Sequence, residues 1–508
     1  NRLISCEEMT DTYTVFNTSL ENLKIGSDQS IISGVTHSIF HGFNYSPPEA
    51  PWPGWIRYGG YFNENNNWWP HFHLLNAYKA RLSALLQNCD MYADIALLPP
   101  TADMWSLIGM QNEPFPSVLH TDYLSLVWEA MAKNGSGCDY VSERILQDAA
   151  VEGKQLRYGP RRYNALFLAS VESLHPDTAQ KILQFVRSGG RVFCIDAIPL
   201  KSSGWNDHEN NDASVRMLVE KMKAYPHRFI VLQKPEKDYM GWYRAVQERY
   251  RIDPWIRIEN PDPFLMQVRY SAEDGSEYVF IVNSHLHESR QPRIQFSSEL
   301  TRRHHCSVWN PETGGRMRVL TESGGHVTLD MGPAESLLFA FDREKVQEEW
   351  KPLPVTGSDM ASLDTGWLAE FRHCHDGSVK EVVMGRLADL KEIPEFVHFS
   401  GTVIYRNRLE CIDPSGMVIN LGKVFGTSEL IINGVSCGIK WYGRRIFSIE
   451  KYLKPGINTV EVAVTTSMGN YMKSLTDNPI AQYWTNAGTK NQPLQSMGMT
   501  GPVRCYKI

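Results

Sequence analysis

Two adjacent carboxylates, Glu7 and Glu8, end a short apolar run near the beginning of the sequence. A second apolar run carries two imidazoles and is followed by an amide and a phenol, from His37, His41, Asn44 and Tyr45. Carboxylates can exchange protons with a reacting group, and the other side chains can hydrogen-bond a polar substrate. Successive residues of a strand point to opposite faces, so only one of the two glutamates can face such a site. The pattern favours acid–base chemistry on a polar substrate.

The two histidines lie four residues apart, which on a strand places both on one face. We expect His37 and His41 to hydrogen-bond substrate hydroxyls or to hold a carboxylate; the alternative is a pair of core histidines whose partners are protein groups. HxxxH is also a zinc spacing, but on helices, and the sequence has no HExxH. Zinc is not predicted, and the metal ligands, if any, are unknown.

Aromatic and turn-forming residues fill the connection that follows, from residue 46 to residue 67. Such a composition predicts a long, ordered loop over a site. Flat aromatic side chains pack well on the apolar faces of sugar rings, which makes Trp55, Trp68 and Trp69 candidate substrate platforms. The alternative is that these tryptophans fill an interface between domains.

The elements that must position these groups form a strand–helix–strand unit. The polar segment 19–33 between the two apolar runs has helical character, and residues 78–86 show apolar residues at helical spacing. The reactive side chains then gather at the carboxyl ends of the strands, where (β/α) barrels place their active sites. We assign residues 1–87 to the last strands of a (β/α)8 barrel.

Three further segments follow. In 88–254, buried-strand runs alternate with helical patterns, as in a doubly wound parallel sheet of the glutamine-amidotransferase-like kind. It has neither a GxGxxG motif nor a nucleophile elbow, and no cysteine follows the strand at 165–169, so we expect a non-catalytic scaffold. Residues 255–345 predict a small antiparallel β-sandwich, and 346–508 a linker followed by a β-rich domain for which a jelly roll is the simplest architecture.

Composition excludes several classes of function. The chain has 508 residues, of which 42% are apolar and 21% charged, as in an ordinary globular protein of several domains. A net charge of -6 gives no basic surface for nucleic acid or an anionic membrane, and no apolar run is long enough to span a bilayer. The nine cysteines are scattered without CxxC spacing, which indicates separate thiols.

Longer motifs carry a family resemblance. In the last segment, SGTxxY at 400–405, LGKV at 421–424, INGxxxGxxW at 432–441 and LKPGxNxxEVxV at 453–464 resemble the galactose-binding-like sandwich of large glycoside hydrolases. The segments 5–10, 24–28, 34–43, 67–70 and 493–503 together resemble the alpha-L-rhamnosidases of glycoside hydrolase family 106. This resemblance covers nearly the whole chain in the same order.

The resemblance implies an inverting glycosidase that acts on terminal rhamnosyl residues of a polysaccharide or glycoside, with calcium as the candidate cofactor and no organic cofactor. Ser5, Glu7 and Thr10 match the family's SxExxT-like strand end, which gives Glu7 the role of general base and leaves Glu8 as its rival. No second carboxylate before residue 50 stands at a comparable strand end, so we expect the general acid on an earlier strand.

Because the sequence starts with Asn1 rather than Met, we expect the chain to be a fragment whose partner is the preceding part of the same protein. A secreted or periplasmic location follows from this function alone. Two alternatives remain: a related barrel glycosidase of other sugar specificity, and a carbohydrate-binding fragment without activity.

Overall fold

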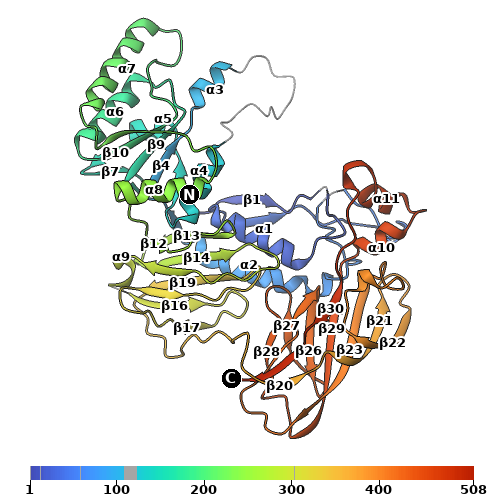
Figure 1. Cartoon of the computed structure of the whole chain (residues 1–508). Helices are drawn as coiled ribbons and strands as arrows, with labels where there is room; N and C mark the ends of the chain where they lie inside the picture. The colour runs from blue at the N-terminus through green and yellow to red at the C-terminus, as the bar shows by residue number, and fades with distance from the viewer. Residues whose placement is uncertain (1, 12, 58, 108–122, 303) are drawn as a thin grey trace.

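The computed structural model describes residues 2–11, 13–57, 59–107, 123–302 and 304–508. Figure 1 shows a strand–helix unit at the centre, an α/β body above one end of it, a β-sandwich below that end, and a second β-rich body at the other end. The chain is thus a mixed α/β protein with several sheets. Of the helices in the described ranges, none is both long and apolar enough to cross a membrane.

The central unit consists of β1 (Ser5–Glu8), α1 (Leu20–Ile32), β2 (His37–Phe40), the 3-10 turn η1 (Trp69–His71) and α2 (Phe72–Leu86). β1 and β2 are parallel, with Ser5 opposite His37 and Glu7 opposite Ile39. Helix α1 begins where Ser19 and Asn22 form a capping box, which supplies partners for two backbone N–H groups at the helix end. The crossover expected at 19–33 is therefore a helix, and α2 starts six residues before the predicted 78–86.

The central helices form a layer between two sheets. One side of α1 and α2 lies under β1 and β2, and apolar residues on the other side, such as Leu23, Leu75 and Leu82, pack on Tyr270 and Phe280 of the sandwich. The sheet of the sandwich that packs on these helices has six strands, in the order β17-β16-β19-β14-β13-β3. Their bounds are β3 (Cys89–Tyr92), β13 (Leu265–Ala272), β14 (Glu277–Asn283), β16 (His305–Trp309), β17 (Arg316–Arg318) and β19 (Ser336–Asp342).

A three-stranded sheet of β12 (Ile256–Ile258), β15 (Arg293–Phe296) and β18 (His326–Thr328) covers its other face, with the short helix α9 (Ser298–Thr301) beside it. The sequence-based boundary at residue 88 assigns β3 to the α/β segment, whereas β3 is antiparallel to β13. Its short, polar sequence has no periodicity that could distinguish the two sheets.

The α/β body has five parallel strands in the order β11-β10-β9-β4-β5. The strands are β4 (Ile95–Leu98), β5 (Cys138–Tyr140), β9 (Ala165–Ala169), β10 (Arg191–Ile195) and β11 (Phe229–Leu232). The helices are α3 (Thr101–Leu107), α4 (Leu124–Lys133), α5 (Glu143–Asp148), α6 (Pro176–Arg187), α7 (His208–Lys223) and α8 (Tyr239–Tyr250), and a small antiparallel sheet contains β6 (Ala150–Glu152), β7 (Gln155–Tyr158) and β8 (Arg161–Tyr163). Separate apolar clusters on the two faces of the sheet hold α4 and α8 on one side and α6 and α7 on the other.

The last body packs a six-stranded sheet, in the order β22-β21-β23-β29-β26-β27, against a four-stranded sheet, in the order β20-β31-β24-β28. The strands are β20 (Ser358–Ser362), β21 (Thr365–His373), β22 (Val379–Arg386), β23 (Gly401–Cys411), β24 (Met417–Asn420), β25 (Lys423–Phe425), β26 (Thr427–Ile432), β27 (Val435–Lys440), β28 (Ile446–Ser448), β29 (Gly456–Thr465), β30 (Gly498–Gly501) and β31 (Arg504–Lys507). Besides the short turns η2 (Leu390–Glu392) and η3 (Gly488–Lys490), helices α10 (Gly469–Ser474) and α11 (Pro479–Thr485) lie between β29 and β30.

A buried polar network joins three of these bodies. Lys24, fully buried on α1, donates to Asp28 (2.6 Å) and to the carbonyl of Ala334 in the sandwich (2.7 Å). Its ammonium also lies 4.3 Å from the ring centre of Tyr442, which belongs to the last body. Arg444, two residues further on, forms a double ion pair with Asp330 (2.6 and 2.7 Å). These contacts fix the last body against the central unit and the sandwich.

Candidate active site

The two glutamates of β1 point to opposite faces. Glu8 is 5% exposed and faces the helices, where it forms an ion pair with Lys79 of α2. Burial lowers the pKa of Lys79, and the hydrogen bond that its ammonium donates to Glu8 acts against that shift. Glu7 faces the other side of the sheet and is exposed. The two side chains therefore alternate as expected on a strand, and Glu7 lies on the face of β1 that the helices do not cover.

The open face of β1 and β2 carries a small set of polar groups around Glu7. The hydroxyl of Thr10 donates to Oε1 of Glu7 (2.9 Å), which orients the carboxylate. Ser5, on the same face, lies with its hydroxyl 2.8 Å from Nδ1 of His37. Within the described ranges, β1 and β2 pair only with each other, and Ile39 on this face is 54% exposed. A carboxylate that is held at one oxygen and open at the other can accept a proton from water.

A hollow of about 290 Å³ lies beyond the carboxyl end of β1. Thr10 and Asp11 line it on one side, and Gln495 reaches it from the far end of the chain. The carboxylate of Asp11 accepts hydrogen bonds from the backbone N–H groups of Tyr13 (2.7 Å) and Thr14 (2.8 Å) and from the hydroxyl of Thr18 (3.0 Å). Asp11 therefore braces the turn after β1 and is occupied by protein groups.

The groups at the end of β2 divide into exposed and structural ones. Tyr45 is 65% exposed, and His41 is half-buried, with its backbone N–H bonded to the carbonyl of Glu8 (2.7 Å). Asn44, by contrast, is 6% exposed, and its side chain bonds the backbone of Gly42 and Arg57 (3.2 Å each). The prediction of Asn44 as a substrate ligand is not supported by this geometry, because its amide holds the loop together.

The three candidate tryptophans lie in different surroundings. Trp68 is 3% exposed and donates its indole N–H to the carbonyl of Thr18 (2.9 Å), so it is a core residue and cannot be a platform. Trp69 is half-buried and stacks on Phe72, with ring centres 5.4 Å apart. Trp55 is 57% exposed. Trp68 thus lies among residues of the central unit, such as Phe62 and Phe72, whereas Trp55 keeps the geometry of a platform.

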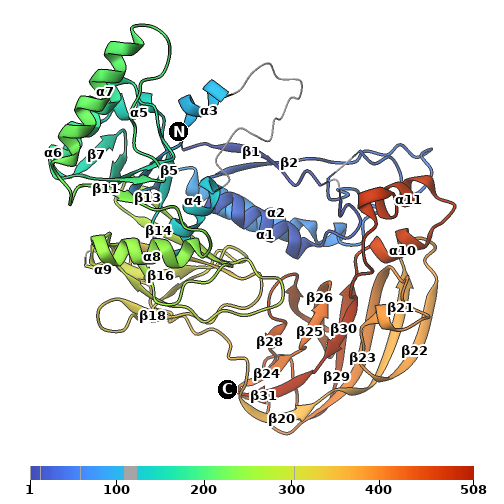
Figure 2. The ribbon, with the colours of Figure 1, turned by 45° about the horizontal axis from the view of Figure 1, so that its top comes forward.

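Trp55 borders a groove whose other wall sequence reasoning missed. Trp55 and Arg57 line one side of this groove of about 660 Å³, and Tyr483, Trp484 and Lys490 line the other. The ammonium of Lys490 lies 3.8 Å from the ring centre of Tyr483 and 4.0 Å from that of Trp484. Figure 2 shows α11 beside the turns that follow β2, although more than four hundred residues separate them in the sequence. The Tyr483-Trp484 pair was the available signal, but nothing local linked it to β2.

A second hollow, of about 570 Å³, continues from this groove past Pro479, which borders both. Trp52 lies 4.2 Å from His375 and 5.8 Å from Tyr471, measured between ring centres. The loop after β2 and the last body therefore build an aromatic surface together.

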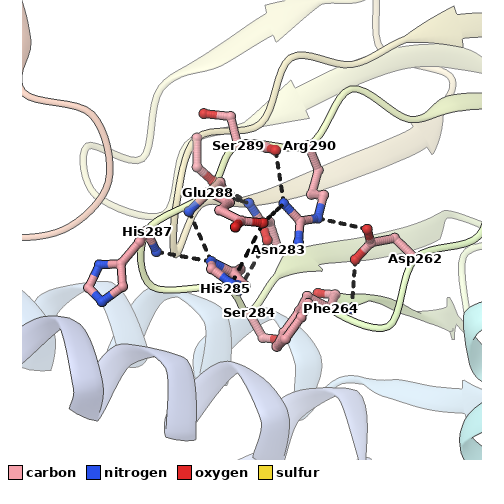
Figure 3. Close-up of polar contacts among 10 residues, drawn as sticks. Asp262, Phe264, Asn283, Ser284, His285, His287, Glu288, Ser289 and Arg290 are labelled. Atoms are coloured by element: carbon pink, nitrogen blue, oxygen red, sulfur yellow. Dashed lines mark hydrogen bonds and ion pairs between the residues drawn. The ribbon is translucent and has the colours of Figure 1, made fainter.

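One other group of imidazoles and carboxylates lies in the turn after β14 (Figure 3). Nδ1 of His285 accepts the backbone N–H groups of His287 (3.1 Å) and Glu288 (2.9 Å), and Arg290 pairs with Asp262 (2.8 Å) and Glu288 (2.9 Å). Every charged group here is engaged in shaping the turn, so we interpret the cluster as structural.

No set of three or more His, Cys, Asp or Glu side chains suited to a metal ion occurs among the described residues. Asp11 lines the hollow beyond β1 and lies four residues after Glu7. Its carboxylate already accepts hydrogen bonds from backbone N–H and hydroxyl groups. Backbone and amide carbonyls also bind calcium, so calcium stays a prediction from the family resemblance.

Comparison with known proteins identifies the family of this chain. The chain is 23% identical over 294 residues to a putative beta-glucuronidase from Formosa agariphila, which covers 58% of this chain and 22% of that protein. The structure of a rhamnosidase from Novosphingobium sp. PP1Y matches 99% of this chain with a TM-score of 0.69 and 20% identity, over 47% of its own length. The chain thus spans less than half the length of either relative. The family model described as alpha-L-rhamnosidase matches residues 1–322. The resemblance seen in the sequence motifs is confirmed, and the chain belongs to the alpha-L-rhamnosidase family, glycoside hydrolase family 106.

Proposed function

We propose that this chain is part of an inverting alpha-L-rhamnosidase, with Glu7 as the general base. The observation that carries the proposal is the opposite orientation of the two glutamates: Glu7 lies on the open face and bonds Thr10 (2.9 Å), whereas Glu8 is buried against Lys79. In an inverting hydrolysis the base removes a proton from water as that water attacks the anomeric carbon, and a separate acid protonates the leaving oxygen. Membership of the family supports rhamnose as the sugar and glycoside hydrolysis as the reaction.

The open face of β1 and β2 supports the proposal that further β/α units complete a barrel there. Parallel strands are normally covered on both faces, yet only the α1–α2 side of this pair is covered within the described residues. We assign the general acid and the remaining strands to the preceding part of the same protein. The same proposal treats the α/β body as a glutamine-amidotransferase-like scaffold and the last body as a galactose-binding-like jelly roll.

The groove between Trp55 and Tyr483 is proposed to hold the sugar on the leaving-group side of the bond. Both rings are more than half exposed, at 57% and 56%, and aromatic faces of this kind pack on pyranose rings. Trp69, Tyr45, His37 and His41 are proposed as further contacts around the site. A secreted or periplasmic location suits a polysaccharide substrate.

A second candidate is a related glycosidase acting on another sugar, and the similarity to a putative beta-glucuronidase favours it. Hydrolysis of 4-nitrophenyl alpha-L-rhamnoside and of 4-nitrophenyl beta-D-glucuronide, by this chain and by the protein with its preceding residues, separates the two candidates. Proton NMR of the first product formed gives the anomer. Rhamnose released first as the β-anomer supports inversion; release as the α-anomer contradicts it, and no turnover of any aryl glycoside by either protein rejects the enzyme.

A further inference from the structure

The carboxyl edge of the five-stranded sheet holds a cavity of about 810 Å³, which Glu7 does not line. Residues that follow three of the strands line it: Pro99 after β4, Ser142 after β5 and Ser173 after β9. In the sheet β4 lies between β5 and β9. The connection from β4 leads to β5 on one side, and the connection from β5 leads back across to β9 on the other side. Open α/β sheets bind ligands at this position, because the loops diverge there and leave a crevice.

Two exposed tryptophans border the cavity. Trp105, on α3, is 71% exposed, and Trp205, in the loop between β10 and α7, is 87% exposed. The rings of Trp205 and His208 meet edge to face, with centres 5.3 Å apart. Large apolar rings left in water at the mouth of a cavity indicate a surface that becomes covered by a ligand. Figure 1 shows α3 at the carboxyl edge of the sheet, beside α5.

The segments that carry these rings are braced by hydrogen bonds. The carboxylate of Asp103, two residues before Trp105, accepts the backbone N–H groups of Glu172 (2.9 Å) and Ser173 (3.2 Å). Asp212 in turn accepts from the N–H (2.6 Å) and the hydroxyl (2.8 Å) of Ser202, close to Trp205. The backbone segments that carry the two rings are therefore held in place before any ligand arrives, which lowers the entropic cost of binding.

The polar part of the lining is neutral and hydroxyl-rich. It offers the hydroxyls of Thr101, Ser106, Ser142, Ser173 and Ser203. Its two charged residues, Glu143 and Arg144, have opposite charges, so the lining has no net charge. Each already has a partner: Glu143 accepts the N–H of His175 (2.8 Å), and Arg144 pairs with Asp148 (2.9 Å). Such a lining suits an uncharged ligand with many hydroxyls and with apolar ring faces.

We propose that this cavity is a second carbohydrate-binding site, which takes one or two residues of a neutral oligosaccharide between Trp105 and Trp205. The choice of a carbohydrate among neutral ligands rests on the proposed function, but binding here does not require Glu7 to be catalytic. The site would hold a polymer on the enzyme while another part of the same polymer is cleaved.

The test is binding of the labelled protein to an array of neutral and acidic oligosaccharides. Trp105→Ala and Trp205→Ala are each expected to weaken binding to neutral glycans by about tenfold. Tyr158→Ala serves as the matched control, since Tyr158 on β7 is also an exposed aromatic of this body, at 40%, and does not line the cavity. Glu7→Gln is expected to retain the tryptophan-dependent signal.

Three results would overturn the proposal: no glycan signal that depends on the two tryptophans, an equal loss in Tyr158→Ala, or a smaller oligomer for Trp105→Ala or Trp205→Ala in sedimentation velocity, which would identify the surface as a contact between copies of the chain. Failure of the proposed function looks different. In that case, aryl glycosides are not hydrolysed, whereas tryptophan-dependent glycan binding persists.

Discussion

Replacing Glu8 with Gln should destabilise the central unit, whereas replacing Glu7 with Gln should not. The carboxylate of Glu8 is the partner of Lys79, and their side chains are only 3% and 9% exposed. Removing one member of a buried ion pair leaves the other charge without compensation, which costs about 3–5 kcal/mol. Glu7 is exposed and loses only part of its bond to Thr10, because a Gln oxygen can still accept it, so the change should stay within about 0.5 kcal/mol.

The charge left without a partner in Glu8→Gln is the ammonium of Lys79, which gives a second prediction. Burial already lowers the pKa of Lys79, so without Glu8 the ammonium loses its proton more readily, and the stability gap between Glu8→Gln and the wild type should narrow at alkaline pH. The other oxygen of Glu8, Oε1, has no hydrogen-bond partner among the described residues, so the pair is imperfect. The double variant Glu8→Leu/Lys79→Met should therefore recover most of the loss.

The measurement is urea unfolding combined with hydrogen exchange of the peptides that cover β1 and α2. In the activity assay, folded Glu8→Gln should keep its turnover, and Glu7→Gln should lose about 10²–10⁴-fold. The reasoning is refuted if Glu7→Gln unfolds more easily than Glu8→Gln, or if the double variant is no more stable than Glu8→Gln alone.

The remaining predictions concern other parts of the fold. Lys24→Met should cost about 3–5 kcal/mol in calorimetry, because the buried carboxylate of Asp28 loses its positively charged partner. Lys380→Met, which removes an exposed pair, should cost under about 1 kcal/mol, and equal effects would contradict the buried network. Burial raises the pKa of Asp94 to about 7, so the native state binds the extra proton and the unfolding free energy should fall as pH rises from about 4 to 7. Asp94→Asn, which keeps an acceptor for the N–H of Gly137, should flatten that slope; an unchanged slope would show that Asp94 titrates normally. Trp55→Ala should raise KM for a polymeric rhamnoside about tenfold without changing it for an aryl rhamnoside, and an equal rise for both would place Trp55 at the cleaved sugar.

The local sequence determined much of the molecule. Alternation on β1 required Glu7 and Glu8 to face opposite sides, and the helical character of the polar segment 19–33 predicted α1. The strand expected at 165–169 is present as β9, and the expected alternation continues with α6 and β10. These features depend on residues within a few positions of one another, so their signal is complete in a short stretch. The resemblance to glycoside hydrolase family 106 was likewise readable in the sequence, and the family model that matches residues 1–322 confirms it.

Tertiary structure alone decided which face of β1 is open and which aromatic rings are platforms. Trp68 and Trp55 look alike in sequence, yet packing buries the first and leaves the second beside α11. β3 joins the sandwich because β13 offers it an edge, a partner more than one hundred and seventy residues away. Contacts of this kind depend on where distant segments meet. The groove between Trp55 and Tyr483 and the cavity between Trp105 and Trp205 therefore appear only when the chain is folded.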